Sequence, residues 1–224
     1  MLSSDINALW LSFKLASITV LILLLIAIPL ARYLAYSQSR LVPWINSIVV
    51  LPLVLPPTVL GFYLLSIMRN DSVLGALFVK LTDSQLIFSF TGLVLASVVY
   101  SLPFVVQPIV ASFQKVGKQS IQTAQSIGAS KRTIFWKITL PLSKTGIISA
   151  AILGFVHTLG EFGVVLMVGG NIPQKTRVVS IQIFNHVENL QLKQANQLAL
   201  ILLILSFSVI LWMNFNAKNN RLIP

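Results

Sequence analysis

The chain contains no cysteine and few charged residues, because Asp, Glu, Lys and Arg make up 9% of its 224 residues. The lack of cysteine excludes disulfides, thiolate metal sites and cysteine nucleophiles. An ordinary soluble domain is excluded too, since about a quarter of its residues would be charged. Hydrophobic residues make up 56% of the chain and its mean hydropathy is +0.87, which excludes a disordered chain. The composition therefore predicts a protein surrounded mainly by lipid.

Acidic residues are the scarcest class of charge. There are 5 Asp and Glu against 16 Lys and Arg, which gives a formal net charge of +11. In a soluble protein this excess would suggest nucleic acid as a partner. In a membrane protein it first indicates basic cytoplasmic loops, so we expect a lipid bilayer and no nucleic acid.

Long gaps between charged residues identify the membrane spans, because a helix needs about 20 mostly apolar residues to cross the hydrocarbon core. They predict an all-α integral membrane protein with five spanning helices, and a sixth span remains open. The five stretches are 15–31 (which 7–13 can extend), 41–68, 84–114, 145–174 and 194–217. The third stretch is longer than one crossing needs, so part of it should form a flanking turn. We expect 1–224 to be a single transmembrane domain. Residues 1–11 hold Asp5 but no Lys or Arg, which favours a retained first helix over a secretory signal.

The distribution of Lys and Arg predicts the orientation, because cytoplasmic loops are enriched in cations. With the N-terminus outside and the C-terminus cytoplasmic, the inner loops hold Arg32, Arg40, Lys115, Lys118, Lys131, Arg132, Lys137, Lys144, Lys218 and Arg221. The outer side then holds Arg69, Lys80, Lys175, Arg177 and Lys193, with Lys14 near its boundary. We therefore expect a multi-pass protein of the cytoplasmic (inner) membrane in this orientation.

The inner cations cluster in one loop, 115–144, which has the pattern of two short amphipathic helices. Apolar residues recur there at three- and four-residue steps, first Ile121, Ala124 and Ile127 and then Ile134, Phe135 and Ile138. Gly128 fits the end of the first helix, Ser130 can cap the second, and Pro141 should end it. Two interpretations fit such a loop: a basic surface that touches anionic lipid, or a docking element for a partner.

The spacing within this loop favours the partner. Gly128, nine further residues and then Ile138-Thr139-Leu140-Pro141 resemble the coupling-loop signature of ABC importer permeases. That family's Glu-Ala-Ala triplet corresponds to Gln122-Thr123-Ala124, in which only the last residue matches. The resemblance implies the ABC importer permease fold and a coupling site for a separate ATPase, formed by Gln122, Thr123, Ala124, Gly128, Ala129, Ile138, Leu140 and Pro141. The chain itself contains no Gly-x-x-x-x-Gly-Lys-Ser/Thr motif.

Two further segments narrow the resemblance. Residues 51–61 read Leu-Pro-Leu-Val-Leu-Pro-Pro-Thr-Val-Leu-Gly, and their three prolines predict either a simple kink or irregular backbone along a watery path. In combination with the loop, this segment resembles the second helix of molybdate-type permeases. Residues 155–163 and 169–176 resemble oxyanion-importer permeases, and the similarity runs from about Ser12 to Thr176. It implies a molybdate importer, with tungstate, sulfate or another oxyanion as the alternative substrates.

Glu161 is the one charge within the fourth apolar stretch, which marks it as a functional candidate. It lies 17 residues after Lys144, about 25 Å along a helix, toward the outer end of the membrane core. Its charge repels a dianion, so a structural or gating role is expected. His157 precedes it by one turn, and an internal hydrogen bond between the two is favoured over a metal site or proton relay.

The residues expected to line the anion path or its gate are Pro56, Pro57, Thr158, Gly160, Glu161 and Gly163. Gly160 and Gly163 are expected to permit close helix contact in a homodimeric centre. The resemblance also implies two copies of the ATPase and an extracytoplasmic molybdate-binding protein, with no cofactor or metal in this chain. The other hypotheses are an intramembrane enzyme using His157 and Glu161 as acid and base, and a passive scaffold or ATP-independent channel.

Overall fold

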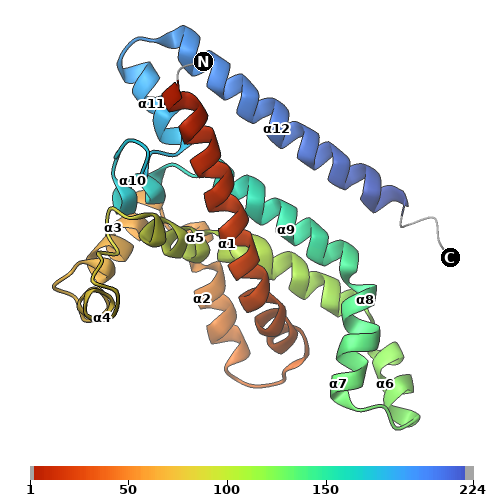
Figure 1. Cartoon of the computed structure of the whole chain (residues 1–224). Helices are drawn as coiled ribbons and strands as arrows, with labels where there is room; N and C mark the ends of the chain where they lie inside the picture. Colours follow the sequence, from red (N-terminus) through yellow and green to blue (C-terminus); the bar gives the residue numbers. More distant parts are fainter. Residues whose placement is uncertain (1–2, 220–224) are drawn as a thin grey trace.

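The computed structural model describes residues 3–219, apart from the side chains of 118–120, 214 and 216–219, and within these residues all regular structure is helical. Figure 1 shows the order of the helices. They are α1 (Ser3–Tyr36), α2 (Val42–Val54), α3 (Pro57–Met68), α4 (Val73–Thr82), α5 (Phe90–Lys115), α6 (Lys118–Ser126), α7 (Lys131–Ile134), the π-helical turn η1 (Phe135–Thr139), α8 (Leu140–Leu142), α9 (Lys144–Leu159), α10 (Gly163–Gly169), α11 (Val179–Glu188) and α12 (Leu192–Asn219). The expected all-α class is confirmed.

Within residues 3–219, three helices (α1, α5 and α12) are long and apolar enough to cross a membrane on their own. Two bent pairs raise the number to as many as five: α2 with α3, bent by 114°, and residues 131–142 with α9, bent by 66°. The expected turn before the third span is present, because α5 begins only at Phe90. The expected continuous span 145–174 is wrong: α9 ends at Leu159 and α10 begins at Gly163.

The centre of the bundle consists of α1, α5 and α9, which pack along much of their length. Leu23 and Ala27 of α1 are fully buried against Val105 and Ile109 of α5. Gly154 of α9 brings that helix close to α5, since a Cβ built on it would lie 2.5 Å from a methyl carbon of Val105. Small residues at helix contacts permit such approach in lipid. By contrast α12 packs mainly on α11 and α9 and leaves most of its surface exposed, as Figure 1 shows.

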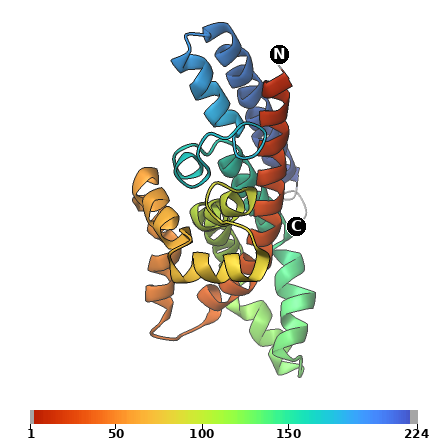
Figure 2. The ribbon, with the colours of Figure 1, turned by 60° about the vertical axis from the view of Figure 1, so that its left-hand side comes forward.

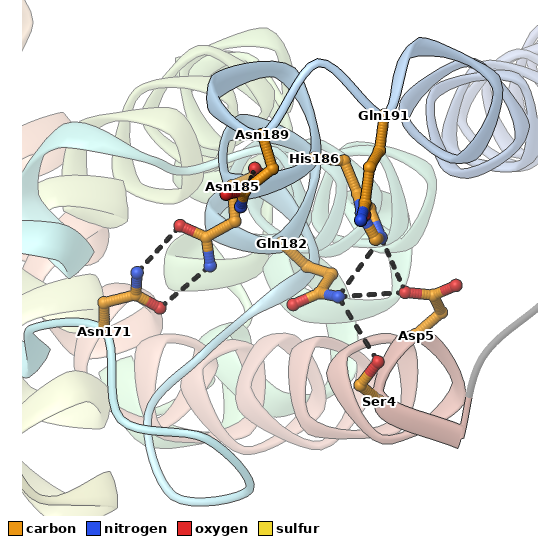
Figure 3. A network of polar contacts seen from close by, with 8 residues as sticks. All are labelled: Ser4, Asp5, Asn171, Gln182, Asn185, His186, Asn189 and Gln191. Atoms are coloured by element: carbon orange, nitrogen blue, oxygen red, sulfur yellow. Dashed lines mark hydrogen bonds and ion pairs between the residues drawn. The ribbon is translucent and has the colours of Figure 1, made fainter.

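A buried polar network fixes α11 to the first turns of α1 (Figure 3). Asp5 is only 1% exposed, and its Oδ1 lies 2.8 Å from Nε2 of His186 and accepts a 2.9 Å hydrogen bond from the amide of Gln182. The backbone N–H of Val179 donates to the hydroxyl of Ser12, 2.8 Å away. Buried polar groups of this kind stabilise a fold only when they are paired. The N-terminal end of α1 is therefore held by side chains far away in the sequence.

The loop 115–144 forms a helical hairpin at one end of the molecule, away from α11 and the N-terminus (Figures 1 and 2). The two expected helices are present, and the Oγ of Ser130 accepts a hydrogen bond from the N–H of Thr133, as expected for a cap. Gly128 has a φ of +83°, a conformation that favours glycine. The second helix does not end at Pro141: through η1 and α8 it continues to Leu142, beyond which Ser143 marks the bend into α9.

Candidate functional site

The tandem prolines break the second apolar segment completely. A residue that precedes proline is pushed into an extended conformation, and both Leu55 (φ −73°, ψ 138°) and Pro56 (φ −54°, ψ 137°) are extended. Pro57 then occupies the first position of α3, where its missing N–H costs nothing. The result is an elbow of 114° rather than the simple kink that the sequence also allowed.

A second break separates α9 from α10. α9 ends at Leu159 with Gly160 as its C-cap, and Glu161 and Phe162 lie outside both helices. The carbonyl oxygen of Glu161 accepts a hydrogen bond from the hydroxyl of Ser180 on α11. Non-helical backbone at membrane depth needs such partners, because lipid offers none. The chain thus interrupts two of its apolar segments and satisfies part of the freed backbone internally.

The two breaks lie in direct contact. A Cβ built on Gly163, at the start of α10, would lie 2.8 Å from Cβ of Pro57. One turn further along α3, a Cβ on Gly61 would lie 2.8 Å from Cβ of Met167. Within this chain Gly163 makes a close contact with another helix and Gly160 does not, and the contacts expected of both in a homodimer stay a prediction. Gly160 is exposed, and its nearest neighbours, at 3.7 and 4.0 Å, are carbonyl oxygens of its own helix.

A chain of hydroxyl groups joins α5 to the end of α9. Ser101 Oγ lies 2.9 Å from Nδ1 of His157 and 2.9 Å from Oγ1 of Thr158, which donates to the carbonyl of Gly154. Each of the three groups donates one hydrogen bond when Nδ1–H of His157 donates to the hydroxyl of Ser101 and that hydroxyl donates to Thr158. This order requires the tautomer of His157 with hydrogen on Nδ1. The ring is stacked on Phe104, at a centroid distance of 3.7 Å.

The expected hydrogen bond between His157 and Glu161 is wrong, because α9 ends at Leu159 and the two residues no longer share a helix face. Glu161 is 4% exposed, and neither of its carboxylate oxygens makes a hydrogen bond of ordinary geometry. The hydroxyl of Ser97 on α5 lies near the carboxylate and is likewise without a geometric hydrogen-bond partner. The side chain of Glu161 is therefore enclosed by protein, between α5 and the break.

The path and gate candidates occupy different environments. Glu161 and Thr158 are buried inside the bundle, where the Thr158 hydroxyl is fully engaged, and Gly163 is half-buried. Pro56 and Pro57 are exposed at the elbow.

Sequence reasoning missed the hydroxyls of α5, which belong to Ser97 and Ser101. Their spacing of four residues within an apolar span was an available signal, since it aligns two hydroxyls on one helix face.

Of the residues expected to couple to an ATPase, five lie in α6 and the turn of the hairpin (Gln122, Thr123, Ala124, Gly128 and Ala129), and three lie further along the chain, in η1 and α8 (Ile138, Leu140 and Pro141). Gln122, Thr123, Gly128 and Pro141 are exposed, Ala124 is buried, and Ala129, Ile138 and Leu140 are half-buried. The turn is closed by two backbone hydrogen bonds, from Gly128 N–H to the carbonyl of Gln125 and from Ala129 N–H to that of Ala124. The hairpin therefore presents a polar outer face on a defined turn.

Comparison with known proteins agrees with this architecture. The model of the family "Binding-protein-dependent transport system inner membrane component" matches residues 24–221. The chain is 50% identical over 206 residues to the "Molybdenum transport system permease protein ModB" of Azotobacter vinelandii, covering 92% of this chain and 91% of that one. It is 34% identical over 203 residues to the "Probable sulfate transport system permease protein cysT" of Anthoceros angustus, covering 91% and 69%.

A solved structure shares the fold at 14% sequence identity. It is the crystal structure of a bacterial ABC transporter involved in the import of the acidic polysaccharide alginate, with a TM-score of 0.77 over 100% of this chain and 82% of that one. The expected ABC importer permease fold is thereby confirmed. The helical hairpin, the broken apolar segments and the match over residues 24–221 together show that this chain belongs to the family of inner membrane components of binding-protein-dependent transport systems.

Proposed function

We propose that this chain is the permease subunit of an ATP-driven importer of molybdate, and of tungstate, across the cytoplasmic membrane. The observation that carries the proposal is the contact between two interrupted helices, Pro57 at the elbow of α2 and α3 against Gly163 at the break before α10. Broken helices in membranes are tolerated where they line a solute path. Molybdate as the solute follows from the 50% identity to a molybdenum permease, and sulfate or another oxyanion is the second candidate.

The anion path in this proposal runs along the surface of the chain, where a second copy closes it. The centre between α1, α5 and α9 is filled with buried apolar side chains such as Leu23, Val105 and Ile109, which leaves no lining for an anion. Pro56, Thr58 and Gly160 are exposed beside the two breaks. A homodimer that pairs these faces encloses a path between the two copies.

The groups that meet the anion should donate hydrogen bonds weakly enough to release it. Thr58 offers an exposed hydroxyl in the first turn of α3. A carboxylate would repel a dianion, and Glu161 is enclosed by protein. We assign Glu161, with Thr158, Gly160 and Gly163, to holding the break in shape or gating it.

Energy enters through the hairpin of α6 and α7. Two copies of a separate ATPase subunit bind the hairpins, because this chain has no phosphate-binding glycine loop of its own. Helix-in-groove docking places an amphipathic helix of this length on a partner. An extracytoplasmic binding protein delivers the anion at the opposite end and supplies the high affinity, in line with the family to which the chain belongs.

Competition for uptake tests the substrate. Vesicles that contain the transporter should take up labelled molybdate, and a tenfold excess of unlabelled tungstate should remove most of the label. The same excess of sulfate should leave uptake almost unchanged. If sulfate competes as well as tungstate does, the chain belongs to a general oxyanion importer and the molybdate assignment is wrong.

The orientation, N-terminus outside and C-terminus cytoplasmic, has its own test. The chain lacks cysteine, so single cysteines report position without background. Ser126→Cys on α6 and Ser84→Cys before α5 both replace exposed residues. In intact cells permeabilised only at the outer membrane, an impermeant thiol reagent should label Ser84→Cys and spare Ser126→Cys. The reverse labelling would invert the topology.

A further inference from the structure

The end of the molecule that carries the hairpin has cations but no acidic residue to balance them. None of the 5 acidic residues lies within 32–45 or 115–144, since they are Asp5, Asp71, Asp83, Glu161 and Glu188. Among the residues that the structure describes, the ion pairs are Arg69 with Asp71 and His186 with Asp5. The counter-charge for the hairpin end must therefore come from outside the chain.

Two of these cations line one pocket. It has a volume of about 530 Å³ and lies between the last turns of α1 and the hairpin. Arg32 and Lys131 supply its positive charge, and the amides of Gln122 and Gln125 are further donors. Pockets for small ligands span roughly 300–1,000 Å³, so this one is large enough for a polar head group.

Packing holds the guanidinium of Arg32 in place. Its Cζ lies 4.4 Å from the ring centroid of Phe135, which is 7% exposed and packs edge-on against Phe113 at 6.0 Å. The hydroxyl of Tyr36 donates a 2.7 Å hydrogen bond to the carbonyl of Phe113, which fixes the opposite wall. A cation that is oriented in advance on an aromatic face loses little entropy when it binds an anion.

The position of the pocket identifies the source of the anion. It opens where the spanning helix α1 ends at Tyr36, and Trp136 (58% exposed) and Leu142 (64% exposed) project from the adjoining helix. Exposed aromatic and apolar side chains at such a level are typical of the membrane interface. Basic pockets there bind the head groups of anionic lipids. A free anion would leave the apolar wall formed by Ile121 and Ile134 without a partner.

We propose that this pocket, between α1, α6 and α7, binds the phosphate of an anionic phospholipid through Arg32 and Lys131. The lipid belongs to the cytoplasmic leaflet, a statement that rests on the orientation given under the proposed function. It bridges the end of a spanning helix to the hairpin that contacts the ATPase. Binding of lipid does not depend on transport, so a failure here leaves the importer assignment intact.

The test is a lipid titration of the purified full-length chain in detergent, read by native mass spectrometry. Phosphatidylglycerol should bind more tightly than phosphatidylcholine. Arg32→Gln and Lys131→Gln should each weaken phosphatidylglycerol binding about fivefold, and the double variant about 25-fold. Arg132→Gln is the matched control, because Arg132 is adjacent to Lys131 and exposed but does not line the pocket. It should change binding less than twofold.

Two results would overturn the proposal. Equal losses in Arg132→Gln and Lys131→Gln would mean a diffuse basic surface with no specific site. Displacement of the lipid by millimolar inorganic phosphate would mean a free-anion site. Lys131 is exposed, so Lys131→Gln tests the pocket even if Arg32→Gln proves too unstable to purify. The thiol labelling of Ser126→Cys separately decides whether the leaflet is the cytoplasmic one.

Discussion

Gly128→Val is expected to lower molybdate uptake about tenfold while ATP hydrolysis continues. Gly128 has a φ of +83°, and a Cβ added there would meet nothing within 4 Å. Glycine is therefore required at this position by the backbone conformation and not by a lack of space for a side chain. A β-branched residue at positive φ costs about 1–3 kcal/mol, which is enough to remodel the turn between α6 and α7. Uptake and hydrolysis measured on the same proteoliposomes give the ratio that reports coupling.

Gly128→Asn is the control for this experiment, because asparagine adopts positive φ far more readily than valine does. It should retain uptake within about twofold of the unchanged chain. Both variants should insert into the membrane at normal levels, since the turn lies outside the spans. If Gly128→Val transports as many anions per ATP as the unchanged chain, the hairpin is not the coupling element.

The second large effect is expected from a single added methyl group at the contact between the two breaks. In Gly163→Ala the new Cβ would lie 2.8 Å from Cβ of Pro57, whose ring cannot rotate away. Overpacking of this kind typically costs about 1–3 kcal/mol and shifts backbone. We expect uptake to fall about fivefold or more, together with a lower thermal unfolding temperature in detergent.

Gly160→Ala makes the same chemical change three residues earlier and serves as its control. Gly160 is exposed, has a φ of −90°, and has no neighbour nearer than 3.7 Å to an added Cβ. Its melting temperature in detergent should match that of the unchanged chain, because the added methyl group meets no close neighbour within the chain. Equal damage in both variants would show that the α9–α10 break is sensitive everywhere, and that its contact with Pro57 has no special role.

Hydropathy predicted the three helices that are long enough to cross the membrane, α1, α5 and α12, because a spanning helix must be apolar along most of its length. Local chemistry predicted an interruption at residues 51–61 because of their three prolines, and it left a simple kink and irregular backbone both open. Capping likewise predicted the hairpin turn at Gly128 and Ser130. These features depend on residues that are close together in the sequence, so the sequence alone is enough to predict them.

Features that depend on distant partners were not predictable in this way. The break after Leu159 interrupts an apolar run in which Glu161 is the one charged residue, and the hydroxyl of Ser180 on α11 donates to the carbonyl of Glu161 at the break. His157 pairs with Ser101, 56 residues away, in place of Glu161. The short helices α4 and α11 were missed because each is only 10 residues long, too short to produce a spanning signal.

In the proposed function, ATP hydrolysis on a separate subunit drives an anion past this chain. Proteoliposomes that contain the chain, the ATPase and the binding protein should accumulate labelled molybdate against a gradient when ATP is supplied. Omitting the ATPase, or replacing ATP by a non-hydrolysable analogue, should abolish accumulation. Accumulation that persists unchanged without the ATPase would contradict ATP-driven import through this chain.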